Sequence, residues 1–506
     1  MNKQQIKTLP ELFARQLDAL KLPASNDISS DVASGPSAGL DKTSDPAAPI
    51  RIAIALSGGL DSSALLHLAH AYAQSLSQQP SPIALFAFHI HHGISPHADA
   101  WLAHCERSCL ELGIVFEARR VTLDDKSKTG VEDAARKSRY AALGELCRLH
   151  GATLLLTAHH QDDQAETVLL QLLRGSGTAG LSGMDTANFA PALLGNAALM
   201  MARPLLAQSR QQLAAYVASH QIAFVDDESN HDPRFARNAL RHQVMPALAG
   251  AFPGYQERFA RSAQHAQSAQ RLLIELAAQD LAQCQDGDCL DISQLRLLSA
   301  DRAYNLLRYW FGKRQLRMPS TAWLAQMLAQ LLDARADAQL LVTHPDCHVR
   351  RHRERLYLAP KLSQLAGMRD EEDADEDGAV AAPTQAFAWH GEAQMPFPDY
   401  GGVLHFELAA EGEVALDSSW LRGQKLTINF RKGGERLKLA ANRPTKSLKY
   451  HYQALDVPAW ERTRLPIVSA GQKLLFAAAI GMDCQHLTSA APEGVRLRWQ
   501  CTDQAH

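Results

Sequence analysis

Short apolar runs alternate with longer amphipathic stretches in the first part of the chain. A run that is apolar throughout predicts a buried strand, whereas a helical repeat of apolar positions predicts a surface helix. After a strand, loop and helix within Arg51–Leu66, the pattern predicts strands at Ile83–Ile90, Ile114–Val121 and Ala152–Thr157 and helices at Ala98–Leu112 and Val131–His150. Such alternation predicts an α/β domain whose parallel sheet is covered on both faces.

The segment between the first strand and its helix is rich in glycine and serine. Glycine permits close approach of the backbone to a ligand, the helix start favours an anion, and serine hydroxyls add donors. A Walker loop would carry a lysine here, whereas this chain carries Asp61. A carboxylate beside a polyphosphate requires a cation between them, so the loop predicts a pyrophosphate site with Mg²⁺ on Asp61. The alternative is an ordinary glycine–serine turn.

Two further polar clusters follow predicted strands. His89, His91 and His92 end the second strand, and Ala158–Glu166 follows the fourth. The carboxyl ends of parallel strands lie at one edge of a sheet, so we expect these clusters to meet the loop. The histidines could bind a metal. A polar strand end beside a nucleotide is favoured, because neighbouring residues of a strand point to opposite faces.

Asp163 and Glu166 are three positions apart, which places both carboxylates on one face of a helix. Two aligned carboxylates near a nucleotide suit Mg²⁺ or a substrate ammonium group. The alternative is that these acids complement the dipole at the start of a helix.

The order Ser-Gly-Gly-x-Asp-Ser at positions 57–62 resembles the loop of N-type ATP pyrophosphatases, which cleave ATP to AMP and pyrophosphate. Further motifs follow in order, and together they resemble those of tRNA(Ile)-lysidine synthetases. They are Gly130–Arg136 with Arg139-Tyr140, His160-x-x-Asp163-x-x-Glu166-Thr167, Arg174-Gly175-x-Gly177-x-x-Gly180-Leu181, Arg203-Pro204-Leu205-Leu206 and Asp227–Asn238. The resemblance implies a Rossmann-like PP-loop domain with a parallel sheet, a mostly helical middle domain and a small α+β carboxy-terminal domain.

In that family, ATP adenylates the C2 oxygen of the wobble cytidine in the isoleucine tRNA with a CAU anticodon. The ε-amino group of L-lysine then displaces AMP. The resemblance implies that the incoming lysine lies on Asp163 and Glu166 and that Mg²⁺ lies on Asp61. It implies the catalytic residues Asp61, Arg136, Arg139, His160 and Arg237. It implies ATP phosphates on Ser57, Gly58, Gly59, Leu60, Asp61, Ser62 and Ser63.

Composition divides the chain into five parts. Residues 1–49 are expected to be an extension and disordered tether, with a short helix within Met1–Leu22, because Pro23–Pro49 is rich in Ser, Ala, Asp and Pro. Residues 361–397 are expected to be an acidic linker, since seven of the eight residues at 370–377 are acidic. The other parts are the PP-loop domain at 50–240, the substrate-binding domain at 241–360 and the carboxy-terminal domain at 398–506.

The substrate-binding region has the pattern of a helical domain. Ala251–Gln283 and Ala300–Leu332 predict long helices, and Val349–Leu358 predicts a strand. Neither the amino-terminal extension nor the acidic insert has a counterpart in the family. His91 stands where many relatives carry Asp, which weakens any ligand role at that position.

Positive charge is concentrated near the carboxy terminus. Ile428–Arg464 contains nine Lys or Arg against three Asp or Glu, with Tyr450 and Tyr452 among them. Basic residues interleaved with aromatic ones suit phosphate contacts and base stacking. The alternative is a solvated basic face. We predict a tRNA-binding surface formed by Arg431, Lys432, Arg436, Lys446 and Lys449.

The chain of 506 residues, 46% hydrophobic and 21% charged, has the composition of a soluble globular protein. No apolar run approaches the roughly 18 residues of a membrane span, and the amino terminus lacks a signal-peptide pattern. We therefore predict a cytoplasmic protein with no membrane partner. The oligomeric state stays open, with a homodimer among the alternatives.

Three rival functions share this loop or fold. A tRNA thiolase is disfavoured because the eight cysteines form no Cys-x-x-Cys pair. A glutamine-dependent amide synthetase is disfavoured because no glutaminase-like domain is evident and no cysteine follows Met1. An RNA-binding module that has lost catalysis is disfavoured by the intact Asp61.

Overall fold

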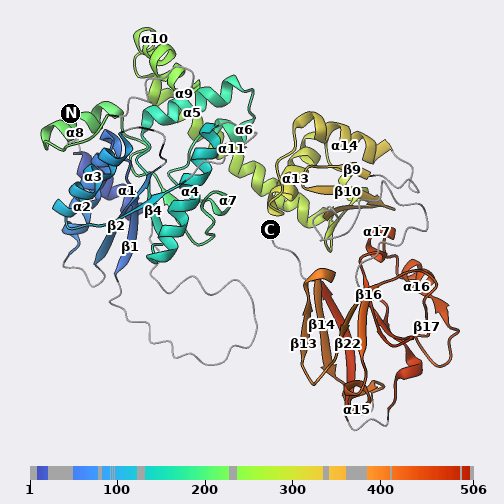
Figure 1. The fold of residues 1–506 in the computed structure, drawn as a ribbon. Coiled ribbons are helices and arrows are strands. Elements are labelled where there is room, and N and C mark those ends of the chain that lie inside the picture. Colours follow the sequence, from blue (N-terminus) through green and yellow to red (C-terminus); the bar gives the residue numbers. More distant parts are fainter. Residues whose placement is uncertain are drawn as a thin grey trace. The chain divides into compact units, whose positions relative to one another are not determined.

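The computed structural model describes residues 8–20, 49–77, 82–91, 93, 95, 97–121, 131–226, 236–333, 341–360, 384–410, 413–489 and 493–501. They form two compact units, Met1–Leu272 and Leu273–His506, which are drawn in Figure 1 and described separately below. Within the described residues, no helix is long and apolar enough to cross a membrane.

The first unit is built on a six-stranded sheet with the order β3-β2-β1-β4-β6-β5. Its strands are β1 (Ile50–Ala55), β2 (Ile83–His91), β3 (Val115–Arg120), β4 (Leu154–Leu156), β5 (Ala187–Phe189) and β6 (Met200–Ala202). Its helices are α1 (Leu9–Ala19), α2 (Leu60–Ser75), α3 (Ala98–Glu111), α4 (Val131–Leu149), α5 (Gln161–Leu173), α6 (Thr178–Leu181), α7 (Pro191–Leu194), α8 (Arg210–Ser219), α9 (Ala236–Ala239), the π-helix η2 (Leu240–Val244), α10 (Met245–Ala251) and α11 (Tyr255–Cys284), which continues into the second unit.

The predicted parallel sheet is confirmed for β1, β2, β3 and β4, and β6 extends it in the same direction. Strand β5 pairs antiparallel with β6 at the edge. Neither β5 nor β6 was predicted. Both are only three residues long, too short to show a period in the sequence.

Alternation along β1 explains why helices cover both faces of this sheet. Ile52 and Ile54 face a core formed with α1, α2, α3 and α8. Ala53 faces a second core, to which α4 contributes Tyr140 and Leu143. Successive side chains of a strand point to opposite faces, so one central strand joins two helical layers.

Helix α1 belongs to the core of the first unit, which was not predicted. A short helix was predicted here, but Phe13 and Leu17 are each only 1% exposed and pack into the core beside α2. Asp18 accepts a 2.6 Å hydrogen bond from the hydroxyl of Tyr72 on α2. The helix is therefore part of the first unit, while residues 21–48 lie outside the described residues.

The second unit begins with a helical layer on an antiparallel sheet of order β7-β8-β11-β10-β9. The elements are β7 (Gln285–Asp286), β8 (Cys289–Asp291), α12 (Ile292–Leu295), α13 (Ala300–Lys313), α14 (Thr321–Asp333), β9 (Leu341–Thr343), β10 (Cys347–His352) and β11 (Arg355–Pro360). Helices α13 and α14 pack on this sheet through Phe311, Trp310 and Leu328, among other residues.

Two predictions in this region were wrong in detail. Ala300–Leu332 forms two helices, because Pro319 lies between them and disfavours helical backbone at the residue before it. Val349–Leu358 forms a hairpin of β10 and β11, with Arg353 in the turn at a φ of 53°.

The rest of the second unit contains two antiparallel sheets, β12-β16-β19-β20-β21 and β13-β14-β22-β15, which enclose one aromatic-rich core. The elements are β12 (Gln385–Phe387), β13 (Gln394–Phe397), η5 (Pro398–Tyr400), β14 (Gly402–Leu408), β15 (Leu416–Asp417), α15 (Ser418–Arg422), β16 (Leu426–Phe430), β17 (Arg436–Leu437), β18 (Lys446–Ser447), α16 (Leu448–Ala454), α17 (Ala459–Arg462), β19 (Pro466–Ala470), β20 (Lys473–Ala477), β21 (Gly481–Met482), η6 (Cys484–His486) and β22 (Gly494–Cys501). Strands β12 and β13 fall within the predicted linker 361–397, whose acidic run lies outside the described residues.

Candidate active site

The phosphate loop joins the carboxyl end of β1 to α2. Gly58 has a φ of +88°, in the left-handed region that favours glycine. A Cβ at this position would come within 2.9 Å of Sγ of Cys105 and 3.0 Å of a methyl group of Val225. The carbonyl of Gly58 also accepts a 2.9 Å hydrogen bond from the N–H of Val225. Glycine is therefore required here by both conformation and space.

Two serine hydroxyls shape the loop from inside. Oγ of Ser62 accepts hydrogen bonds from the N–H groups of Ser57 (3.2 Å) and Gly58 (3.1 Å) and donates to the carbonyl of Gly59 (3.0 Å). Oγ of Ser63 donates to the carbonyl of Gly58 at 3.2 Å. Both hydroxyls were expected to face a phosphate, but they serve the loop's own backbone.

The groups available to an anion are at the start of α2. Ser57 is exposed, and Gly59 is the N-cap of the helix. The first N–H groups of a helix have no acceptor within it, so those of Leu60 and Asp61 suit phosphate oxygens. The side chain of Leu60 packs against the core, which leaves only its backbone for a ligand.

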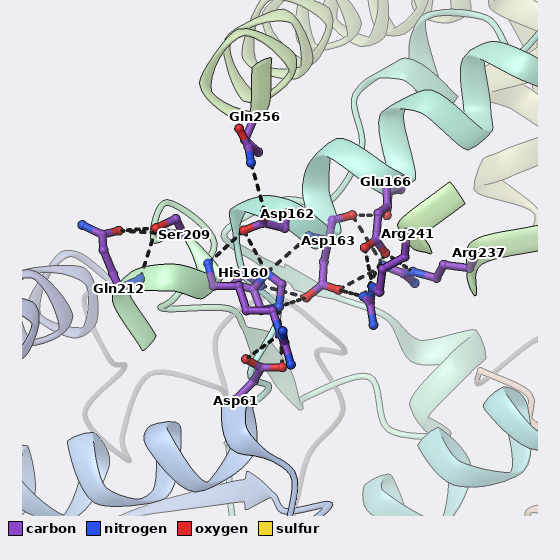
Figure 2. A network of polar contacts seen from close by, with 12 residues as sticks. Asp61, His160, Asp162, Asp163, Glu166, Ser209, Gln212, Arg237, Arg241 and Gln256 are labelled. Carbon is purple, nitrogen blue, oxygen red and sulfur yellow. Dashed lines mark hydrogen bonds and ion pairs between the residues drawn. The ribbon is translucent and has the colours of Figure 1, made fainter. Parts of the chain in front are cut away.

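Asp61 projects from α2 toward His160, as Figure 2 shows. Its Oδ2 lies 3.6 Å from Nε2 of His160, and its Oδ1 lies 3.9 Å from Nε of Arg210. Oδ1 is buried and forms no hydrogen bond within the described part of the chain. A buried carboxylate oxygen without a donor fits a cation, and Mg²⁺ at a phosphate needs only one or two carboxylates. The residues present therefore fit Mg²⁺.

His160 caps α5 at the carboxyl end of β4. Its N–H donates a 3.0 Å hydrogen bond to Oδ2 of Asp163. Burial opposes protonation of the ring most strongly. The nearby carboxylates of Asp61, Asp163 and Asp162 outweigh that effect and raise the pKa of His160 above its ordinary value of 6.5. The ring thus lies between the phosphate loop and the acids of α5, and its Nδ1 accepts a 3.4 Å hydrogen bond from the N–H of Asp163.

The pKa of the neighbouring His159 is shifted in the opposite direction. Burial lowers its pKa to about 3. Asp163 opposes that shift, and the charges of Arg203, Arg237 and Arg136 reinforce it. The ring is therefore neutral at physiological pH, in a region where several guanidinium groups converge.

Asp163 and Glu166 share one face of α5, as predicted, and two arginines contact them (Figure 2). Nε of Arg237 donates to Oε2 of Glu166 at 2.9 Å. Nε of Arg241 donates to Oε1 of Glu166 at 2.7 Å, and its Nη2 donates to Oδ1 of Asp163 at 3.0 Å. The side chain of Glu166 is only 3% exposed, so its charge must be compensated by such partners.

Arg136 and Arg139 are exposed side chains on α4. The guanidinium of Arg136 lies 5.0 Å from the ring centre of Tyr140. Burial lowers the pKa of His89 at the end of β2, and the charge of Arg139 adds to this shift, although a backbone hydrogen bond opposes it. The charge of Arg139 therefore reaches the end of β2, and that of Arg136 reaches His159 after β4.

The histidines that end β2 are engaged with protein groups. Nδ1 of His89 lies 2.9 Å from the carbonyl oxygen of Leu56, and Nε2 of His91 lies 3.1 Å from Oδ1 of Asp99. These contacts favour the polar strand end over the metal site. His92 lies outside the described residues.

Comparisons with known proteins match family models along the chain: a PP-loop domain at residues 37–248, a TilS substrate binding domain at 290–357 and a TilS substrate C-terminal domain at 426–499. The tRNA(Ile)-lysidine synthase of Ralstonia nicotianae is 43% identical over 434 residues, which are 85% of this chain and 89% of the relative. The enzymes of the same name from Burkholderia pseudomallei and Alkalilimnicola ehrlichii are 41% and 39% identical, covering 89% and 85% of this chain and 93% and 89% of theirs.

The chain belongs to the tRNA(Ile)-lysidine synthase family. As a lysidine synthase, it is an ATP-using ligase that forms lysidine on tRNA(Ile). The predicted family and reaction class are confirmed. The α/β PP-loop fold is confirmed as well, and its loop and acids lie together in one region of the first unit.

Two of the predicted tRNA-binding residues lie on the hairpin of β17 and β18, and the other three lie on neighbouring segments of the chain. Lys446 and Arg436 lie on the two strands of the hairpin, and Nη2 of Arg436 donates to the carbonyl of Thr445 at 2.8 Å. Nζ of Lys446 lies 5.0 Å from the ring centre of the half-exposed Tyr450. Arg431 and Lys432 follow β16, and Lys449 is exposed on α16.

Two cations of the lysidine synthase site were missed from the sequence. Arg241 lies four positions after Arg237, and this helical spacing was the one available signal. Arg210, whose N–H donates a 2.8 Å hydrogen bond to Oδ2 of Asp162, has no local signal at all. Asp227–Asp232 of the last predicted motif lie outside the described residues, whereas Arg237 and Asn238 are described.

Proposed function

We propose that this chain adenylates the C2 oxygen of the wobble cytidine in a CAU-anticodon isoleucine tRNA and then joins L-lysine to that carbon. The observation that carries the proposal is the meeting of the phosphate loop with His160, Asp163 and Glu166 at one sheet edge (Figure 2). This arrangement supports a nucleotide site on the loop beside a site for the lysine amine on the two acids.

In the first step, the cytidine carbonyl oxygen attacks the α-phosphorus of ATP, a P–O bond breaks and pyrophosphate leaves. The helix-start N–H groups of Leu60 and Asp61 and the exposed Ser57 bind the leaving phosphates. Asp61 would hold Mg²⁺, which offsets the charge on pyrophosphate when it is bound. His160 lies beside Asp61, and the surrounding carboxylates favour its protonated form, which would supply a further positive charge.

In the second step, the lysine ε-ammonium gives a proton to one of the two carboxylates, the freed amine attacks C2, and the bond from C2 to the AMP oxygen breaks so that AMP leaves. Asp163 and Glu166 hold the lysine as an ammonium group. Arg136, Arg139 and Arg237 stabilise charge on the adenylated base, since guanidinium is always protonated.

The state of the cysteines supports ligation over sulfur transfer. Burial raises the pKa of Cys105, Cys109 and Cys147 to about 12. Such thiols remain protonated and are poor nucleophiles. The thiolase alternative would need a reactive thiol near the loop, where Cys105 is instead buried behind Gly58.

We use the name basic hairpin for β17 and β18 together with Arg431, Lys432, Arg436, Lys446 and Lys449. We propose that the basic hairpin holds the body of the tRNA by contacts with its phosphates.

The homodimer also stays a prediction, which sedimentation equilibrium checks.

Exchange of labelled pyrophosphate into ATP tests the two steps separately. We expect exchange to require the CAU-anticodon tRNA and no lysine, whereas AMP release should require both. An isoleucine tRNA with another anticodon is the control. Exchange that proceeds without tRNA would contradict adenylation of the base.

A further inference from the structure

Every carboxylate oxygen of the acid pair on α5 already has a partner. Oδ2 of Asp163 accepts from the N–H of His160, and its Oδ1 accepts from Nη2 of Arg241. Oε1 of Glu166 accepts from Nε of Arg241. Oε2 of Glu166 accepts from Nε of Arg237 and, at 3.0 Å, from Nη2 of Arg241.

An ammonium group needs the same oxygens. It has donors only, and it binds a pair of carboxylates by replacing other donors. The side chains of Asp163 and Glu166 are 13% and 3% exposed, so little carboxylate surface is left for a second cation. A substrate amine therefore competes with a guanidinium group that is already in place.

Arg241 is the guanidinium that most resembles such a ligand. It donates three hydrogen bonds to the two acids, whereas Arg237 donates one to Glu166 and one, at 3.4 Å, to the backbone carbonyl of Asp163, and its Nη2 lies 3.5 Å from Oδ1 of Asp163. Removal of Arg241 from the pair would leave Arg237 to compensate Glu166. Removal of Arg237 instead would also break its contact with the backbone carbonyl of Asp163.

The backbone that carries Arg241 is unusual. Arg241 lies in the π-helix η2 between α9 and α10. The π-helix is rare, and single π-turns within α-helices are frequent at functional sites. A change within η2 would move Arg241 without moving α5.

We propose that Arg241 is an internal stand-in for the lysine ammonium, which occupies Asp163 and Glu166 in the free enzyme and leaves when lysine enters. This inference rests on the proposed lysine site. The device keeps two buried carboxylates neutralised before the substrate arrives. It also sets a threshold for the amine, because a ligand must bind the acids better than Arg241 does.

The test is the KM for L-lysine of Arg241→Gln, measured as AMP release at saturating ATP and tRNA. Loss of the competitor should lower KM about 5- to 100-fold, the range of ordinary coupling between two ligands. The kcat should change less than KM. A structural role for Arg241 would instead raise KM, since the acids would lose their arrangement.

Two further variants make the result decisive. Arg241→Lys keeps the charge but not the guanidinium fork, so KM should fall less than in Arg241→Gln, and this milder variant decides the question if the first one unfolds. Arg258→Gln, an exposed arginine on α11, is the matched control and should leave KM unchanged. A KM above wild type in either Arg241 variant would overturn the proposal.

A binding measurement separates this inference from the function on which it rests. Calorimetric titration of L-lysine into the protein should give a tighter Kd for Arg241→Gln than for wild type. If Glu166→Gln keeps the wild-type KM for L-lysine in AMP release, the lysine site itself is wrong. If wild type depends on lysine and Arg241→Gln binds it more weakly, only the stand-in is wrong.

Discussion

The acids of α5 and the basic hairpin of β17 and β18 are both dense in charge, yet they are organised in opposite ways. Glu166 is buried, and each of its oxygens is matched to a guanidinium donor. Lys432 and Lys449 are exposed, and the carboxylate nearest to Lys432, that of Glu435, is bonded to the backbone N–H groups of residues 432 and 433.

Burial explains the difference. A buried charge without a partner is costly, so the acids of α5 fix the positions of Arg237 and Arg241. An exposed charge is solvated by water and screened by salt, so the lysines of the hairpin need no protein partner. The first arrangement suits precise placement of a small substrate, and the second suits loose contact with a polyanion.

The largest effect on stability is expected when the buried charge of Glu166 is removed. Glu166→Gln should destabilise the first unit by about 3–5 kcal/mol, because it leaves Arg237 and Arg241 with one carboxylate between them. Urea unfolding measures this. Glu145→Gln is the control: that carboxylate is 56% exposed and pairs with Arg119, so its loss should cost below about 1 kcal/mol. Equal losses in the two variants would show that burial is not the deciding factor.

Asp61→Asn should lower AMP release about 100- to 1,000-fold, the cost commonly found when one group that stabilises transition-state charge is removed. tRNA binding should stay close to wild type, because Asp61 lies in the first unit and the basic hairpin in the second. Asp99→Asn, at an exposed carboxylate, is the control. Retention of more than about a tenth of the activity, which is 1.4 kcal/mol, would contradict the Mg²⁺ role.

His160 should make the stability of the first unit depend on pH. Its pKa is raised above the ordinary 6.5, so its contribution is complete below pH 6.5 and is lost as pH rises through the higher folded pKa. The Tm of wild type should therefore fall across this range more steeply than the Tm of His160→Gln. Parallel curves would show that the ring is not protonated in the folded protein.

The smallest effect on stability is expected on the basic hairpin. The double variant Lys446→Gln, Lys449→Gln should leave the free energy of unfolding unchanged. It should reduce the slope of the logarithm of the tRNA binding constant against the logarithm of the salt concentration by up to about 2, since each phosphate contact contributes about 0.9 to that slope. Filter binding over a salt series measures this slope. A slope equal to that of wild type would identify the hairpin as a solvated basic face.

Local patterns were sufficient to predict the parts of the site that depend on neighbours in sequence. The strand, loop and helix around Gly58, the shared face of Asp163 and Glu166, and the edge where they meet all follow from periodicity and strand direction. Helix α5 is capped by His160, which was predicted to belong to the site for its position after β4.

Partners distant in sequence could not be predicted in this way. Arg241 reaches Glu166 across 75 positions, and its own surroundings in the sequence resemble those of any helical arginine. The inward direction of the Ser62 and Ser63 hydroxyls depends on the φ of Gly58, which composition does not reveal. Pro319, which separates α13 from α14, is visible in the sequence as a helix breaker. The apolar repeat continues on both sides of it, however, and indicated one long helix.

Helix α1 bears on how shortened versions of this protein would behave. The PP-loop family model begins at residue 37, so a chain cut to that boundary would lose Phe13 and Leu17 from the core. The apolar surface of α2 that they cover would then be open to water, and such surface promotes association between copies. Poor solubility of a protein trimmed at residue 37 would thus reflect a missing piece of core, and restoring residues 8–20 as a separate peptide should improve it.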